Sequence, residues 1–552
     1  MSHKERQINS PGARRGRLAL GLTLGLSLAA WGQRLPSYLG RHFQLPPLRL
    51  RPVAGLRAHV GPHGLQLSLR QFLLLVLRND PQVQLARLNV SQTATQALAA
   101  RAPYDPQLAF DFGSTRQLAP QYSQLGGANT LDSLSQNSSI NFSERLPSGQ
   151  TFSAGFNGNR YSANSLYNLF NPSISTGLSL SLTEPLLRNR GNLLYKIPLL
   201  QAHGEVLIAS EQSQEQIADL LVSAAQSYWI AAGARQAIQV QQAALKLAQR
   251  SYQHDQRSLK LGALPPMDIY QSEAQVARTR LALLEAQASY REALDSLRRL
   301  IGADLIPKLR NLPITLEDQP KPQPGDSPRQ PLDTALDRAL RHRPALRAAR
   351  RQLLMDALGE TADRNNLQPE LDLTGLYGSN GLGGDALSTA GAMIQPGGLS
   401  NALGQMFRFQ TPTYGFSLQL TLPLRNSAAA ASLANALIAR SRDRAVMRDQ
   451  QQSVAQQVRL ADIELRMAGS EIKEARLARD LAQKNVDAAH KKYILGTTTL
   501  FEYLQQQSQL SDAESALLQA EIAWQEAAVR YRRADWTLFS SLRLRVSPLL
   551  GP

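Results

Sequence analysis

Residues that could carry out chemistry are few in this chain, and they are scattered. Cysteine is absent from the 552 residues, which removes disulfides, thiolate metal sites and cysteine nucleophiles. The eight histidines are dispersed, and neither the zinc motif HExxH nor the nucleophile motif GxSxG occurs. Paired carboxylates do not fall in a loop beside a nucleophile either. The sequence therefore predicts no enzyme activity, no cofactor and no metal site.

Two glycines mark more informative positions than any catalytic motif does. A long segment rich in Ala, Gln, Leu, Glu and Arg is interrupted by "KKYILGTTTLFEYLQQQSQL" (491–510), and the first half has a matching break at "RSLKLGALPPMDIYQSEAQV" (257–276). Gly262 and Gly496 occupy equivalent places, and glycine supplies the positive φ that ends a helix. Thr499 can cap the helix that follows. Each break therefore predicts the turn of a helix hairpin.

Both breaks belong to an internal duplication. Pro81 and Pro344 lie in similar segments, as do Pro106 and Pro369, and the members of each pair are 263 residues apart. A repeated segment predicts a repeated structural unit.

The amino terminus and a proline-rich segment set the expected boundaries. Arginines precede the apolar run "LALGLTLGLSLAAW" at 18–31, which is shorter than the about 20 residues of a membrane helix and is typical of a cleaved export signal. An uncleaved anchor is the alternative. We predict a signal peptide at 1–32, a first repeat at 33–319, a proline-rich linker at 320–331 and a second repeat at 332–552.

Helices and strands are predicted to alternate in each repeat. Apolar residues at helical spacing predict helices at 70–103, 193–260, 266–302, 332–366, 427–494 and 499–540. Alternating apolar and polar residues predict strands at 108–112, 178–182, 371–377 and 416–422, with a further hairpin at 140–156 that turns at Pro147. A helix of about 68 residues rises about 100 Å, nearly the length of two shorter helices laid end to end.

Strands that are apolar on one face and polar on the other suit a membrane β-barrel around water. An amphipathic sheet on a soluble core is the alternative. Four to six strands cannot close a barrel, because natural membrane barrels start at about eight strands. The sequence therefore predicts an α+β membrane protein in which several chains share one barrel.

A formal net charge of +17, mostly from arginine, raises the question of nucleic acid binding. The arginines are spread along the predicted helix faces and interleaved with Gln and Glu, without an aromatic-basic cluster. We therefore expect solvated helix faces and no nucleic acid partner.

From about residue 65 to 540 the chain resembles the outer-membrane efflux proteins of the TolC type. The resemblance rests on the duplication, on "EPLLRNRG" (184–191), and on "LGALPPMDIYQSEAQVA" and "YILGTTTLFEYLQQQSQLSDAE" at the two breaks. It implies a homotrimer in the cell outer membrane, with one transmembrane β-barrel shared by three protomers and a long antiparallel α-helical coiled-coil tunnel in the periplasm. Expected partners are outer-membrane lipid, a periplasmic adaptor (membrane fusion) protein and an inner-membrane RND or ABC-type pump.

The function implied by this resemblance is a passive exit duct, the outer-membrane channel of a tripartite efflux or type I secretion system. Small molecules or proteins would be exported, and drug efflux, metal efflux and secretion stay open because a duct needs no substrate pocket. The alternative is an exported structural or adhesive coiled-coil envelope protein. That alternative explains the helices and the export, but not the strands placed symmetrically in both repeats.

The resemblance also assigns a periplasmic gate. In the family a tyrosine and an arginine at the second tip bond to an aspartate after the first tip, and acidic rings narrow the pore. Tyr493 and Asp268 match the tyrosine and the aspartate, whereas Thr498 replaces the arginine. Glu502 keeps one acidic ring position and Gln505 replaces the other. A weaker latch and a lower cation affinity at the ring would follow.

Four residues at the two breaks are implied to be the tips that contact the adaptor: Leu261, Gly262, Leu495 and Gly496. Ordinary helix-terminus roles compete with the gate. Thr499 and Glu502 have capping-box spacing, and Asp268 sits in a first turn, where an acidic side chain favours the helix dipole.

Overall fold

Two antiparallel helix hairpins make up most of the fold. The computed structural model pairs α5 (Asn192–Lys260) with α6 (Ile269–Ile301), and α10 (Ser427–Ile494) with α11 (Leu500–Ala534). These bounds confirm the predicted helices at 193–260, 266–302 and 427–494 to within a few residues. The helix predicted at 499–540 ends earlier, at Ala534, and a separate short helix follows at Leu538–Ser541. The structure describes residues 53–56, 60–61, 64–121, 127–165, 167–261, 265–323, 325–388 and 392–543. The predicted signal peptide and Gly262 lie outside the described residues.

Two segments predicted as single helices are each divided by a proline. The segment 70–103 forms α3 (Leu69–Asn79) and α4 (Pro81–Ala99), and 332–366 forms α7 (Leu332–His342) and α8 (Pro344–Asn365). Proline disfavours a helical conformation in the residue before it and lacks the N–H that a continuing helix needs. Asp80 and Arg343 accordingly have extended backbones, with ψ 130° and 127°.

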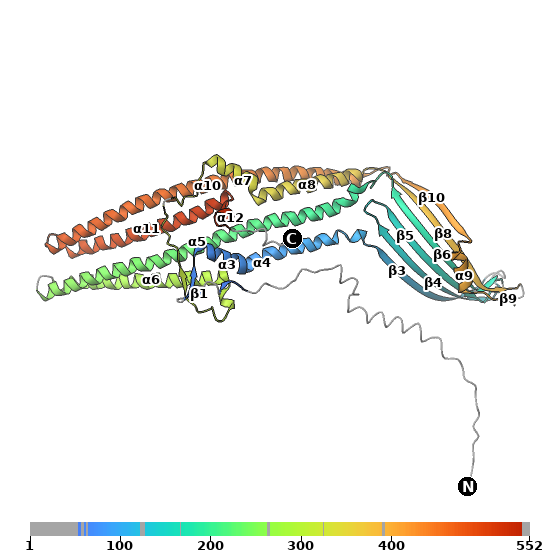
Figure 1. Cartoon of the computed structure of the whole chain (residues 1–552), viewed down its shortest axis with the longest axis horizontal. Helices are drawn as coiled ribbons and strands as arrows, with labels where there is room; N and C mark the ends of the chain where they lie inside the picture. Colours follow the sequence, from blue (N-terminus) through green and yellow to red (C-terminus); the bar gives the residue numbers. More distant parts are fainter. Residues whose placement is uncertain are drawn as a thin grey trace, which may run out of the picture. The chain divides into compact units, whose positions relative to one another are not determined.

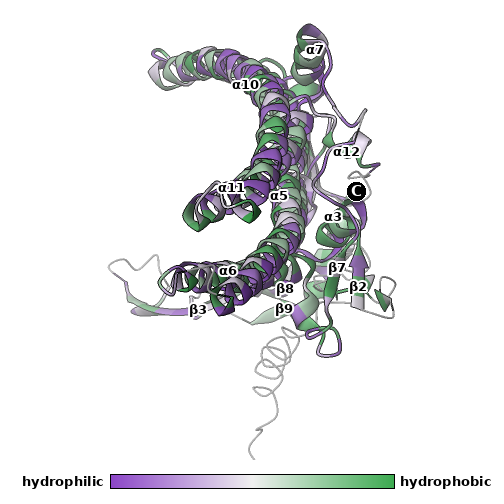
Figure 2. Cartoon of the chain, turned by 90° about the vertical axis from the view of Figure 1, so that its left-hand side faces the viewer, coloured by the Kyte–Doolittle hydropathy of each residue, from purple (hydrophilic) through white to green (hydrophobic). Residues whose placement is uncertain are grey.

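The long helices each run beside two shorter ones, as the sequence predicted. Helices α4 and α6 both contact α5, while α8 and α11 both contact α10. The two hairpins join because α11 and α8 also contact α5. Figure 2 shows that the helices form a curved layer whose convex side carries α3, α7 and α12 (Leu538–Ser541). In the described part of the chain, every helix is too short or too polar to cross a membrane.

A large antiparallel sheet continues from the helices (Figure 1). Its long strands, in spatial order, are β10 (Pro412–Thr421), β8 (Glu370–Leu387), β6 (Phe170–Pro185), β5 (Thr151–Ala163), β4 (Thr130–Arg145) and β3 (Gln107–Pro120). The short β9 (Met393–Gln395) pairs with β8 outside this order. All four predicted strands are confirmed. The predicted 140–156 hairpin is the β4–β5 hairpin, and it lies within the wall of the sheet.

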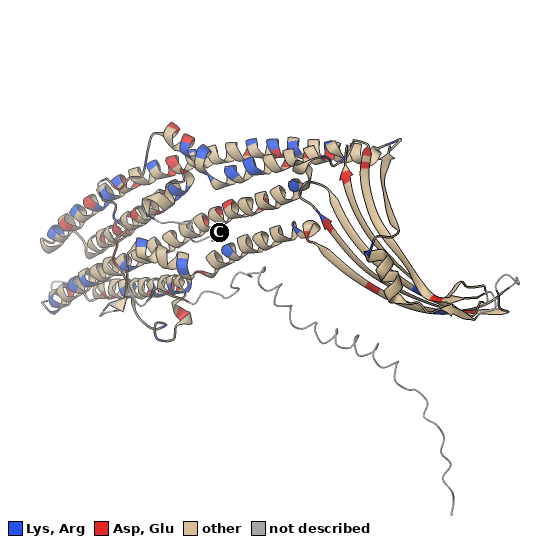
Figure 3. Cartoon of the chain, turned by 45° about the vertical axis from the view of Figure 1, so that its right-hand side comes forward, with Lys and Arg blue, Asp and Glu red and all other residues tan. Residues whose placement is uncertain are grey.

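The strand registers place apolar residues on one face of the sheet. Phe110, Ile140 and Phe156 are aligned across β3, β4 and β5, and the row continues through Leu178 on β6. The row one residue away is polar, with Ser139 on β4 facing Asn157 on β5 and then Gly177 on β6. Figure 3 shows that charged residues crowd the helices and are sparse on the strands. The sheet therefore separates an apolar surface from a polar one.

A compact core lies on the convex side, where the small sheet of β1 (Val60–Gly61), β2 (Gly64–Leu67) and β7 (Ile314–Leu316) packs near α3. The described residues also form 3-10 turns at Ala102–Tyr104 and Ala303–Leu305. The buried Tyr228 of α5 donates its hydroxyl proton to either Asp318 Oδ2 (2.8 Å) or the Leu67 carbonyl (3.0 Å). This tyrosine joins the helical layer to the small sheet.

The segment 320–331, predicted to link the repeats, is held against the second hairpin. Arg329 forms an ion pair with the buried Asp462 of α10 (2.9 Å), and the Gln330 backbone N–H donates to the Tyr531 hydroxyl of α11 (3.1 Å). The segment is therefore fixed at two points on the helices that it crosses.

Candidate functional site at the hairpin tips

The second tip is a glycine-terminated helix end. Gly496 has a φ of 71°, its N–H donates to the Tyr493 carbonyl (3.0 Å), and the Thr497 N–H donates to the Lys492 carbonyl (2.9 Å). These two bonds form a Schellman motif, which requires a left-handed residue at the position of the glycine. The predicted positive φ at Gly496 is confirmed.

Threonines begin the helix that returns from this tip. The Thr499 hydroxyl caps α11 by accepting from the Glu502 N–H (3.2 Å). The neighbouring Thr498 hydroxyl donates to Glu502 Oε2 (2.6 Å). Thr498, at the position where the resemblance implied an arginine, therefore contacts Glu502 within this chain. The expected cap at Thr499 and the carboxylate of Glu502 are parts of one turn.

At the first tip, the structure describes the residues that precede and follow 262–264. Helix α5 ends at Lys260, and Leu261 follows with 83% of its surface exposed. Asp268 is the N-cap residue of α6, its side chain makes no capping hydrogen bond, and its N–H donates to the Pro265 carbonyl (3.1 Å). A carboxylate at this position still interacts favourably with the helix dipole.

Asp255 of α5, which the sequence analysis did not single out, joins the two hairpins near their tips. The Tyr493 hydroxyl donates to Asp255 Oδ1 (2.8 Å), where a bond to Asp268 was expected. The Ser272 hydroxyl of α6 donates to Asp255 Oδ2, and His254 Nδ1 lies 3.5 Å from Oδ1. Asp255 is fully buried. One carboxylate thus connects α5, α6 and α10.

Burial and this carboxylate keep Tyr493 protonated. The pKa of the Tyr493 phenol is raised, first by desolvation, then by its hydrogen bond to Asp255 and by the charges of Asp255 and Asp268. The charge of Asp268 therefore acts on Tyr493, although the hydrogen bond goes to Asp255. A neutral tyrosine is the form that can donate to a carboxylate.

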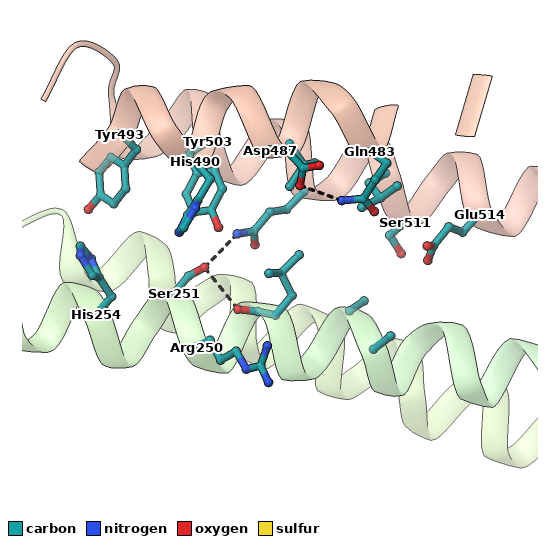
Figure 4. Close-up of a pocket in the computed structure, with 16 residues that line it drawn as sticks. Arg250, Ser251, His254, Gln483, Asp487, His490, Tyr493, Tyr503, Ser511 and Glu514 are labelled. Atoms are coloured by element: carbon teal, nitrogen blue, oxygen red, sulfur yellow. Dashed lines mark hydrogen bonds between the residues drawn. The ribbon is translucent and has the colours of Figure 1, made fainter. Parts of the chain in front are cut away.

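Aromatic rings extend this contact across the hairpins. His254 of α5 lies 5.8 Å from the Tyr493 ring, which stacks on Tyr503 at 5.6 Å, and His490 lies 5.3 Å from Tyr503. They line a cavity of about 420 Å³ between the hairpins (Figure 4). Within it the Gln507 amide of α11 donates to Ser251 Oγ of α5 (2.8 Å). Polar and aromatic contacts together hold the hairpins near their tips.

The remaining predicted gate residue, Gln505, is exposed on α11. It lines a groove of about 600 Å³ between α6 and α11, together with Tyr270 and Phe501. Glu502 is exposed as well. The structure thus brings Thr498 and Glu502 together and Tyr493 close to Asp268, and it places Gln505 in a separate groove.

The spacing of residues in the sequence could have identified Asp255 as part of a helix contact. Ala248, Ser251 and Asp255 follow one another at three and four residues, and all three are buried. Small and polar residues at such positions mark a helix face that meets another helix closely. The sequence does not contain the identity of the partner, because Tyr493 lies 238 residues away.

Helix hairpins that continue into a sheet with one apolar and one polar face define a class of protein, the outer-membrane channels with a helical tunnel. The chain belongs to the outer membrane efflux protein family, whose model matches residues 73–303 and 335–535. The protein is an outer-membrane efflux channel, and its family works in tripartite systems with an adaptor and an inner-membrane pump. A search of curated proteins found no match.

Solved structures share this fold over nearly the whole chain. The CusC channel is 16% identical over 89% of this chain and 98% of its own, with a TM-score of 0.60. The CmeC channel of Campylobacter jejuni is 14% identical over 88% and 89% of the two chains, with a TM-score of 0.59. The open MtrE channel of Neisseria gonorrhoeae is 18% identical over 85% and 89%, with a TM-score of 0.56.

Gly496→Ala tests the turn at the second tip. Open space surrounds the glycine, so the cost should be the strain of a left-handed alanine, about 1–2 kcal/mol. We expect hydrogen exchange at the Thr497 amide to speed up about tenfold. Gly469→Ala is the matched control, because alanine in the interior of α10 should favour the helix. Unchanged exchange at Thr497 would contradict the Schellman assignment.

Proposed function

We propose that three copies of this chain form the exit duct of a tripartite efflux or type I secretion system. The duct would pass small molecules or proteins from an inner-membrane RND or ABC-type pump, through a periplasmic adaptor, to the outside. The observation that carries the proposal is the sheet, which has an apolar face, a polar face and two open edges.

The open edges are β3 and β10, the first and last strands of the sheet order. An unpaired strand edge in a membrane is costly, so the edges must pair. Six long strands are too few for a closed barrel. Three copies of six would give 18 strands, a size that leaves an aqueous channel.

Exposed apolar residues on the outer helices support lateral contacts between copies. Helix α10 exposes Leu460, Ile463 and Met467, which are spaced by three and four residues, and α6 exposes Leu281 and Leu284. A stripe of this kind is expected to be covered by another helix. Such contacts between neighbouring protomers would close the curved layer into a tunnel.

The tips supply the remaining elements of the proposal. Leu261 and Leu495 are 83% and 76% exposed, and exposed apolar side chains at a hairpin end suit contact with a partner protein. With Gly262 and Gly496 they would form the adaptor-contacting surface. Tyr493 and Asp255, aided by Asp268, would hold the tunnel shut between export events.

Assembly is the first test of this proposal. Mass measurement of the detergent-solubilised protein should give three copies, and the complex should migrate differently in SDS before and after boiling. Crosslinked pull-down should then recover an adaptor together with either an RND or an ABC-type pump. A stable monomer that conducts ions would contradict the shared barrel.

A further inference from the structure

Helix α9 (Leu399–Phe407) lies against the sheet, close to Gly381 and Gly383 of β8. Its inner side packs tightly, because Ala402 and Met406 are fully buried and Ser379 Oγ of β8 donates to the Met406 carbonyl (2.8 Å). A Cβ at Gly381 would collide with the carbonyl oxygen of Ala402. The approach of helix to strand therefore depends on glycine, which indicates a fixed position for α9.

The register shows which face of the sheet α9 covers. Gly381 pairs with Thr176 of β6, and Ser379 pairs with Leu178, so these residues share a face. Two residues further along β8, Tyr377 shares that face and contacts the Phe409 ring that follows α9 (5.8 Å). Leu178 belongs to the apolar face of the sheet. Helix α9 therefore lies on the apolar side, away from the polar face.

The figures agree with this placement. In Figure 1, α9 is drawn in front of β8 and β6, on the same side as α3, α7 and α12. Figure 2 shows that this side is the convex one. The convex side is the outside of the proposed tunnel.

Beyond the apolar band, the outward positions of the sheet become polar. On β3 and β4, the exposed Arg116 forms an ion pair with Asp132, and on β5 Arg160 donates to Gln136 of β4 (3.1 Å). These residues lie toward the ends of β3, β4 and β5 that are remote from Gln107, where β3 begins after α4. The change from apolar to charged residues on an outward face marks the level at which acyl chains give way to headgroups.

Helix α9 sits at this level and exposes apolar side chains. Leu399 and Phe407 are 52% and 61% exposed, although the helix packs firmly on its other side. Phe409, Met393 and Ile394 nearby are exposed as well. The contact between Phe409 and Tyr377 links these side chains to the apolar face of the sheet.

We propose that α9 is an interfacial helix that docks into the outer leaflet of the membrane, with Leu399 and Phe407 among the lipid acyl chains. Amphipathic helices bind lipid by burying such side chains at the boundary between headgroups and acyl chains. Arg408 and Arg160 would lie at the level of the lipid phosphates. The helix would fix the height of the sheet in the bilayer.

Tryptophan quenching tests this directly. The assembled protein carrying Phe407→Trp is reconstituted in phosphatidylcholine vesicles whose acyl chains carry bromine either near the headgroup or near the chain end. We expect about half or more of the added fluorescence to be lost with shallow bromine, and less with deep bromine, relative to unbrominated vesicles. The protein without the added tryptophan supplies the background.

Two control positions calibrate the result. Phe416→Trp, on the apolar face of β10 and 80% exposed, should be quenched, whereas Leu376→Trp, on the polar face of β8 and 41% exposed, should not. Leu399→Trp provides a second reporter on α9. The proposal is overturned if neither α9 reporter is quenched while Phe416→Trp is, as would happen if a neighbouring protomer covered α9. It is also overturned if Leu376→Trp is quenched as strongly as the α9 reporters.

Two glycine substitutions on β8 test whether the packing of α9 on the sheet sets its depth in the membrane. Gly381→Ala should displace α9 and change the depth profile of the Phe407→Trp signal, because a Cβ there meets backbone. Gly375→Ala on the same strand meets open space and should leave the profile unchanged. Equal profiles in both variants would contradict the packing on which the proposal rests.

Discussion

Tyr493→Phe should raise the resting conductance of the channel. The substitution removes only the hydroxyl that donates to the buried Asp255, and a hydrogen bond to a charged group contributes about 1.5–3 kcal/mol. Loss of that energy would shift the balance from closed toward open about ten- to a hundredfold for each protomer. Single-channel recording in planar bilayers measures this effect.

Two aspartates provide the matched comparison. Asp255→Ala removes the acceptor of Tyr493 and Ser272, whereas Asp268→Ala removes a nearby charge that makes no capping bond. We expect a large rise in conductance for Asp255→Ala and a small one for Asp268→Ala. The reverse order would mean that the latch runs through Asp268 in the assembled channel.

A double mutant separates a latch from general loosening. Tyr493→Phe and Asp255→Ala break the same bond, so the second change should add little once the first is made. Fully additive effects would instead indicate that each residue supports the tip independently. Expression and trimer mass serve as controls for folding, since removal of a buried charged group can destabilise a protein.

Prediction from sequence succeeded where one local pattern decided the structure. Helices α5 and α10 are long because helix-forming residues continue without proline inside their middle turns, and Gly496 ends α10 because it can adopt a left-handed conformation. The alternation of apolar and polar residues in the strands follows from the two faces of a sheet. Each of these features depends on neighbours within a few residues.

The breaks at Pro81 and Pro344 are local, and the rule for proline could have found them.

Features that depend on distant partners were missed or misplaced. Asp255 could not have been paired with Tyr493, because the contact depends on how α5 and α10 meet. Helix α9 was not predicted from the sequence, and its position depends on a close approach to Gly381.

Deleting the β4–β5 hairpin should narrow the barrel without preventing its assembly. Across the sheet Leu108 of β3 is aligned with Phe142, Ala154 and Leu180 of β6, all on the apolar face. Removal of β4 and β5 would bring Leu108 opposite Leu180 with both faces preserved, because β3 and β6 also run antiparallel. An Asn-Gly turn in place of residues 119–169 would suit the new two-residue hairpin.

Three copies of the remaining four strands would give a barrel of 12 strands instead of 18. Because barrel diameter grows roughly linearly with strand number, the diameter should fall by about a third. Electron microscopy of the trimer measures the diameter. Conductance should be measured in channels that also carry Tyr493→Phe. The tips are then expected to be open, so that the barrel is the narrowest part of the channel and limits the conductance.

The control for this deletion replaces only the β3–β4 loop, residues 121–129, with the same Asn-Gly turn, so that the number of strands is unchanged. It should keep the full diameter and conductance. Equal diameters in the deletion and the control would show that β4 and β5 do not contribute to the closed wall. A deleted chain that still forms trimers of smaller diameter would instead establish that strand number sets the width of the channel, and that β4 and β5 are not needed for three chains to assemble.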